Sequence, residues 1–135
     1  MCRLMIDLFV KGDVKVIDEF VKPNFIEHSA APGMPTGVEG LRAIANMIRG
    51  GFPDFNIIVE DQVAEGDRVV LRFTEEGTQK GKVFGIPPSG NRARWSAIHI
   101  IRVEDGKMAE HWDTIDLLGM MRQLGAIHAP APSHV

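Results

Sequence analysis

The first half of the chain carries hydrophobic residues at a helical spacing. Apolar side chains recur every three or four positions over residues 3–10, 14–21 and 39–49, which is the pattern of helices that bury one face. Gly12 directly follows the first segment, and glycine is common where a helix ends. The pattern predicts three N-terminal helices, with a loop rich in Pro, Gly and Ala over residues 29–37 before the third.

Beyond Pro53 apolar and polar residues alternate, as they do in strands with one buried face. Residues 56–64 and 68–76 predict one pair of strands, and residues 94–116 predict a second pair. Helices followed by a meander of strands are typical of an α+β fold, in which helices pack against one face of a mostly antiparallel sheet. A curved sheet with helices on its concave side leaves room for a ligand pocket.

The second strand pair carries ionisable residues where a strand normally buries apolar ones. His99 lies within the apolar run 97–101, and Asp113 shares a face of the next strand with His111. A type I turn over residues 103–106, with its glycine at a left-handed bulge position, places His99 opposite His111 or, one step diagonally, Asp113. A histidine and a carboxylate on one face of a sheet are suited to proton transfer.

Composition excludes several classes of function. The 135 residues, 44% hydrophobic and 24% charged, predict one soluble globular domain over residues 1–135, with a loose tail at 128–135. The net charge of −3 and the absence of a basic run argue against nucleic acid as a partner. No apolar run approaches the roughly 20 residues that span a membrane. Cys2 is the single cysteine, so an internal disulfide is excluded and a cytoplasmic location is expected.

The candidate residues also have structural interpretations. Asp113 could pair with Arg94 or Arg102, and His99 could be a hydrogen-bonded core histidine. His28 either lines the mouth of the pocket or faces solvent from a loop. Histidines and an aspartate could form a metal site, but the chain has no His-x-His or His-x-x-x-His pair. The sequence therefore predicts no metal site.

Several short segments of the chain, spread over residues 4–127, resemble a known family. These segments are Phe25–Ser29, Gly85–Gly90, Ile98–Arg102, Asp105–Lys107, Glu110–Asp113, Asp116–Gly119 and Gln123–Gly125. Together they resemble the SnoaL-like polyketide cyclases, also called the ester cyclase family, which belong to the nuclear transport factor 2-like superfamily.

The resemblance implies a cone-shaped α+β barrel, in which a strongly curved, mostly antiparallel sheet is closed by the three N-terminal helices around an apolar pocket. It also implies a homo-oligomer, a dimer or tetramer, formed through the outer face of the sheet near Arg72 and Arg102. Asp113 matches the aspartate that acts as acid and base in these cyclases, and His99 matches the histidine beside it. This chemistry needs no metal and no organic cofactor.

Residues and resemblance together predict an acid/base enzyme, of aldol-cyclase or isomerase type, that acts on a small apolar carbonyl compound bound in the pocket. The expected substrate-binding side chains are His28, Phe52, Trp95, His111 and Trp112. The alternative is a non-catalytic ligand-binding or dimerisation module on the same fold. An epoxide hydrolase with two aspartates bridged by an arginine is not expected, because Ala97 and His99 occupy the matching positions.

Overall fold

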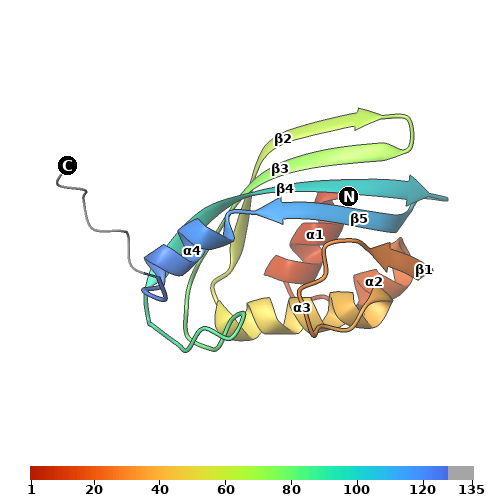
Figure 1. Cartoon of the computed structure of the whole chain (residues 1–135). Helices are drawn as coiled ribbons and strands as arrows, with labels where there is room; N and C mark the ends of the chain where they lie inside the picture. Colours follow the sequence, from red (N-terminus) through yellow and green to blue (C-terminus); the bar gives the residue numbers. More distant parts are fainter. Residues whose placement is uncertain (128–135) are drawn as a thin grey trace.

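The computed structural model of the protein describes residues 1–127 and consists of a curved sheet with helices on one side (Figure 1). All three predicted N-terminal helices are present, and the first continues into a wider, π-helical turn. The helical segments are α1 (Cys2–Met5), the π-helical turn η1 (Ile6–Val10), α2 (Lys15–Phe20), α3 (Gly37–Gly51) and α4 (Leu117–Gln123).

Five strands form a single mixed sheet in the order β1-β5-β4-β3-β2. Strand β1 pairs with β5 in parallel, and the remaining neighbours are antiparallel. The strands are β1 (Val21–Glu27), β2 (Asn56–Glu65), β3 (Arg68–Thr78), β4 (Arg92–Glu104) and β5 (Lys107–Ile115).

The predicted α+β class and the mostly antiparallel sheet are confirmed, but two features were wrong. The sheet ends at β1 on one side and at β2 on the other, so it is an open sheet and no closed barrel is formed. Strand β1 was not predicted, because Pro23 and Asn24 interrupt its apolar pattern and only Val21 and Phe25 are well buried. Proline is tolerated there because β1 is an edge strand.

Helix α3 packs its apolar face toward the sheet and closes the core. Its side chains Leu41, Ala45 and Ile48 are buried, as the helical spacing predicted. The helices α1, α2 and α3 all lie on the same side of the sheet in Figure 1. Phe73 of β3 faces them and is completely buried. The core therefore lies between the inner face of the sheet and the helices.

The turn between β4 and β5 differs from the predicted one. Asp105 and Gly106 have φ angles of 53° and 73°, and positive φ at both central residues is characteristic of a two-residue type I′ turn. The bulge lies further along, where the register of β5 shifts by one residue at Ala109. Beyond this bulge His99 pairs directly with Asp113, so the predicted direct pairing of His99 with His111 was wrong and the diagonal partner is the direct one.

The opposite face of the sheet exposes apolar side chains to solvent, including Val63 at 61% and Ile98 at 46%. Association into a homo-oligomer through this face, with Arg72 and Arg102 nearby, stays a prediction. No helix within residues 1–127 has the length and apolar character needed to cross a membrane. The predicted loose tail, residues 128–135, lies outside the described residues.

The C-terminal turn of α3 gives a test of the packing between this helix and the loop after β3. A Cβ atom on Gly51 would lie 1.9 Å from Cγ2 of the fully buried Val83, whereas a Cβ on Gly50 would meet nothing within 4 Å. We expect Gly51→Ala to lower the free energy of unfolding by about 1–3 kcal/mol through overpacking.

Gly50→Ala is the matched control and should raise the free energy of unfolding by roughly 0.5–1 kcal/mol, because alanine favours the helix. Urea unfolding of both variants measures the difference. Equal effects of the two substitutions would contradict the packing described here.

Candidate active site

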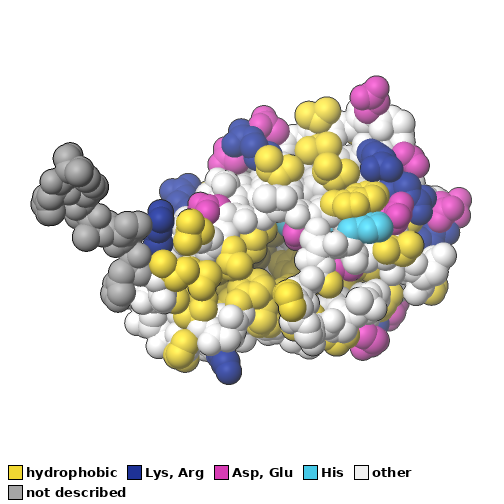
Figure 2. Space-filling view, in the orientation of Figure 1, with side chains coloured by type: hydrophobic (Ala, Val, Ile, Leu, Met, Phe, Trp, Pro, Cys, Tyr) yellow, Lys and Arg dark blue, Asp and Glu magenta, His cyan; other side chains and the backbone are white. Residues whose placement is uncertain are grey.

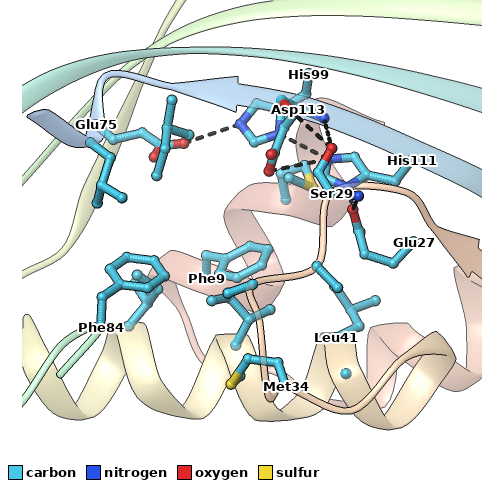
Figure 3. A pocket seen from close by; sticks show the side chains of 18 of the residues that line it. Phe9, Glu27, Ser29, Met34, Leu41, Glu75, Phe84, His99, His111 and Asp113 are labelled. Atoms are coloured by element: carbon cyan, nitrogen blue, oxygen red, sulfur yellow. Dashed lines mark hydrogen bonds and ion pairs between the residues drawn. The ribbon is translucent and has the colours of Figure 1, made fainter.

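A cavity of about 360 Å³ lies between the inner face of the sheet and the helices. Figure 2 shows hydrophobic side chains gathered around a hollow in this face of the molecule. Phe9 of η1, Leu41 of α3, and Met34 and Phe84 from two loops line the side of the cavity away from the sheet (Figure 3). This volume and lining suit a small, largely apolar molecule.

The sheet side of the cavity carries the polar groups (Figure 3). His99 on β4 and His111 and Asp113 on β5 all line it. His111 and Asp113 are two residues apart and therefore point to the same face of the strand. The bulge at Ala109 precedes both residues, so it leaves their alternation intact. The structure thus brings together the three residues that the hairpin pattern singled out.

The two histidines are hydrogen-bonded to each other. His99 Nδ1 lies 2.9 Å from His111 Nε2, and both side chains are nearly inaccessible to solvent. Asp113 is close to both, with its Oδ2 atom 3.8 Å from His99 Nδ1 and 4.0 Å from His111 Nε2. Asp113 is the most accessible of the three at 28% side-chain exposure, so it is the group most open to a bound ligand.

Burial raises the pKa of Asp113 above its ordinary value, because the ionised carboxylate loses hydration. Positive charge on His111 and His99 acts in the opposite direction, and the carboxylates of Glu27 and Glu75 add to the increase. The shift moves Asp113 toward the range in which a carboxylate works as a general base.

Strand β1 contributes two groups to the cavity that were not predicted. Glu27 Oε2 lies 2.6 Å from His111 Nδ1. Ser29, just after the strand, accepts a hydrogen bond from the Asp113 backbone N–H at 2.9 Å and donates one to the Asp113 carbonyl oxygen at 3.2 Å. The parallel pairing of β1 with β5 makes these contacts possible, since it places Glu27 beside His111.

Glu75 on β3 is the other unpredicted group. Its Oε2 atom lies 3.2 Å from His99 Nε2, and its Oε1 atom accepts a hydrogen bond from the indole N–H of Trp95 at 2.9 Å. Glu75 is only 9% exposed. The sequence signal for it was available, because Leu71 and Phe73 define the inner face of β3 and Glu75 continues that alternation. Glu27 could have been identified from the sequence only if strand β1 had been predicted.

Two predicted substrate-binding residues, His28 and Trp112, lie on the opposite face of the sheet and do not line the cavity. Each alternates with a cavity residue, His28 with Glu27 and Trp112 with His111, so each points outward. Their rings stack at 4.5 Å with an interplanar angle of 3°. His28 also pairs with Glu110 at 3.0 Å.

Trp95 and Phe52 point inward but lie in the core rather than in the cavity lining. Phe52 is fully buried and its ring centroid is 5.2 Å from that of Trp95. Trp95 reaches the site through its hydrogen bond to Glu75. Of the predicted binding residues only His111 lines the cavity, and its contacts place it beside His99 and Asp113.

The structural alternatives for Asp113 do not hold in residues 1–127. Arg94 pairs with Glu76 at 3.7 Å, and Arg102 pairs with Glu110. No arginine or lysine of the described chain lines the cavity.

A metal ion could be considered because His99, His111 and Asp113 each offer a ligand atom, all within 4.8 Å of one another. The nitrogens that would bind a metal are, however, hydrogen-bonded to each other. The prediction of no metal site stays a prediction.

Comparisons with known proteins agree with this fold. The chain is 28% identical over 123 residues to the nogalonic acid methyl ester cyclase of Streptomyces nogalater, covering 90% of this chain and 92% of that protein. It is 29% identical over 128 residues to the aklanonic acid methyl ester cyclase DnrD of Streptomyces peucetius, covering 93% and 88%. The solved structure of TsrD from Streptomyces laurentii matches with a TM-score of 0.86 at 36% identity, covering 93% of this chain and 92% of that one.

The family comparison extends over almost the whole described chain. Residues 1–124 match the family described as SnoaL-like polyketide cyclase. The segments that carried the resemblance in the sequence lie within or at the end of this range. The chain therefore belongs to the SnoaL-like polyketide cyclase family.

Proposed function

We propose that this protein is an acid/base enzyme that closes a ring in a small apolar carbonyl compound by an intramolecular aldol reaction, with Asp113 as the general base. The observation that supports this most is the position of Asp113, a partly exposed carboxylate with a raised pKa on the polar side of a largely apolar cavity. The names of the cyclases from Streptomyces nogalater and Streptomyces peucetius support ring closure as the type of reaction.

The proposed reaction needs only protons. The Asp113 carboxylate removes a proton from a carbon next to a carbonyl group, and the resulting enolate carbon attacks a second carbonyl carbon of the same molecule. One C–H bond is broken, one C–C bond is formed, and the new alkoxide oxygen takes up a proton. The substrate and product therefore have the same mass.

The apolar surroundings support both the formation of the enolate and its attack on the second carbonyl carbon. Phe9, Leu41, Ile44 and Met34 leave the substrate few polar partners apart from the sheet side of the cavity. Electrostatic interactions are stronger in such an environment than in water. An enolate formed beside the histidine pair would be stabilised where its charge develops.

Replacing the base gives a direct test. Asp113→Asn should lower kcat by about 10²–10⁴-fold, the usual range for loss of a general acid/base. Nogalonic acid methyl ester and smaller aryl 1,3-diketones that can cyclise are suitable substrates, with the product followed as an isomer of unchanged mass. Unchanged turnover in the variant would show that Asp113 is not the base.

Asp116→Asn is a matched control. Asp116 caps α4 by accepting a hydrogen bond from the Gly119 N–H at 2.9 Å, and it does not line the cavity. Asparagine caps a helix about as well as aspartate, so turnover should stay at the wild-type level. Binding of these compounds without turnover in any form of the protein would favour a non-catalytic ligand-binding module.

The pKa of Asp113 also predicts how stability depends on pH. The pKa is higher in the folded chain than in the unfolded chain, so the folded chain binds more protons between the two values. Stability therefore decreases as the pH rises through this window. Asp113→Asn removes the cost of burying the charge, and we expect it to raise the free energy of unfolding at neutral pH by on the order of 1 kcal/mol, the scale of a single stabilising substitution.

Urea unfolding of wild type and Asp113→Asn at about pH 4.5 and near pH 8 tests this prediction. The advantage of the variant should be larger near pH 8, where Asp113 of the wild type is ionised in both states. An advantage that is larger at the lower pH would contradict the raised pKa.

A further inference from the structure

We propose that His99 and His111 share one proton between Glu27 and Glu75, and that this shared proton serves as the acid that completes the reaction started by Asp113. The inference rests on the proposed function and deepens it. It assigns Glu27 and Glu75 as positioning residues that hold the acid. Neither residue was a candidate from the sequence.

The four side chains form an unbroken hydrogen-bonded row along the sheet. Glu27 Oε2 contacts His111 Nδ1 at 2.6 Å. His111 Nε2 contacts His99 Nδ1 at 2.9 Å, and His99 Nε2 contacts Glu75 Oε2 at 3.2 Å. Each ring nitrogen of both histidines is therefore used, and the row runs across β1, β5, β4 and β3, four neighbouring strands.

Counting protons shows that this row holds one more proton than its residues carry in their usual forms. Each of the three contacts joins two atoms with lone pairs, so each requires one proton between them. Two ionised glutamates and two neutral histidines supply only two protons. In that state two lone pairs would face each other across one contact. Three protons satisfy all contacts and give the row a net charge of −1.

Further hydrogen bonds place the third proton on the histidines rather than on a glutamate. Glu27 Oε1 accepts a hydrogen bond from the Ser29 backbone N–H at 3.0 Å. Glu75 Oε1 accepts one from the indole N–H of Trp95 at 2.9 Å, and an indole N–H can only donate. Donors on both carboxylates favour their ionised forms. The structure thus has an imidazole–imidazolium pair flanked by two negative charges.

The only other titratable group on this side of the cavity in residues 1–127 is Asp113. The helices α1 and α3 and the turn η1, which face the sheet, contribute only Gly40 and apolar side chains such as Met5, Phe9 and Ile48 to the lining. The proton state of the row is therefore set by its own four members and by Asp113, whose Oδ2 atom is 3.8 Å from His99 Nδ1.

This arrangement returns the site to its starting state after each turnover. Asp113 takes the proton from substrate carbon, and the histidine pair gives its shared proton to the new alkoxide. Asp113 then passes its proton to the pair over the short distance between them. The overall reaction consumes no proton, and Glu27 and Glu75 stay ionised throughout.

Nuclear magnetic resonance of the free protein with ¹⁵N-labelled histidine tests the shared proton without a substrate. In the wild type at neutral pH we expect three ring protons on His99 and His111 together. In Glu75→Gln the new amide can donate to His99 Nε2, which satisfies the row with two ring protons, both on Nδ1. In Glu27→Gln the amide donates to His111 Nδ1 instead, and both ring protons should lie on Nε2.

Glu110→Gln is the matched control, since Glu110 pairs with His28 on the outer face of the sheet. It should change the signals of His28 and leave those of His99 and His111 unchanged. Backbone spectra establish that each variant is folded. The inference of a shared proton would be overturned if His99 and His111 of the wild type carried only two ring protons together. It would also be overturned if Glu27→Gln and Glu75→Gln showed the same histidine tautomers.

Kinetic measurements distinguish a failure of the shared-proton inference from a failure of the proposed function. With any substrate whose turnover depends on Asp113, Glu27→Gln and Glu75→Gln should each lower kcat by at least about tenfold while KM changes less than about threefold. Wild-type kcat in both variants would overturn the role of the pair as acid and leave Asp113 as the base. If no compound is turned over, the proposed function fails, and the spectra alone decide whether the proton is shared.

Discussion

The site depends on the register between β4 and β5. Residues directly opposite each other in an antiparallel pair place their side chains on the same face of the sheet. Continued without interruption from the two-residue turn, the register would set His99 opposite Trp112 and turn Asp113 outward. The extra residue at Ala109 moves the pairing by one, so His99 is opposite Asp113. A single bulge thereby decides which face of β5 meets the cavity.

With that register, the order of the strands determines which ionisable side chains lie next to one another. Glu27, His111, His99 and Glu75 come from four adjacent strands, so two carboxylates flank two imidazole rings along one direction of the sheet. Buried ionisable groups are costly unless they are paired and hydrogen-bonded, and no buried side-chain polar atom of residues 1–127 lacks a partner. Asp113 lies beside the row without being part of it, and its burial raises its pKa.

Much of the fold and the centre of the site could be predicted from the sequence. Helical spacing gave α3 and its buried face, and alternation gave β2 to β5 because each of these strands has an apolar inner face. His99 and Asp113 were found because they interrupt such a face. Strand β1 was missed because Pro23 and its polar neighbours mask the alternation, and with it the positions of Glu27 and His28. The placement of Trp112 was wrong for another reason, since the residue between His111 and Asp113 points to the opposite face of the strand, and that alternation was not applied to it.

The sheet side and the helix side of the cavity differ in the kind of residue that forms them. Every ionisable group belongs to a strand and is fixed by backbone pairing on both sides or by a hydrogen-bonded neighbour (Figure 3). Many of the groups that define the shape of the cavity, such as Phe9, Met34 and Ile44, are apolar side chains on helices and loops. Such residues can be exchanged one at a time at modest cost. Descendants of one ancestral chain could thus diverge in the molecules they accommodate while the ionisable groups on the strands are inherited unchanged.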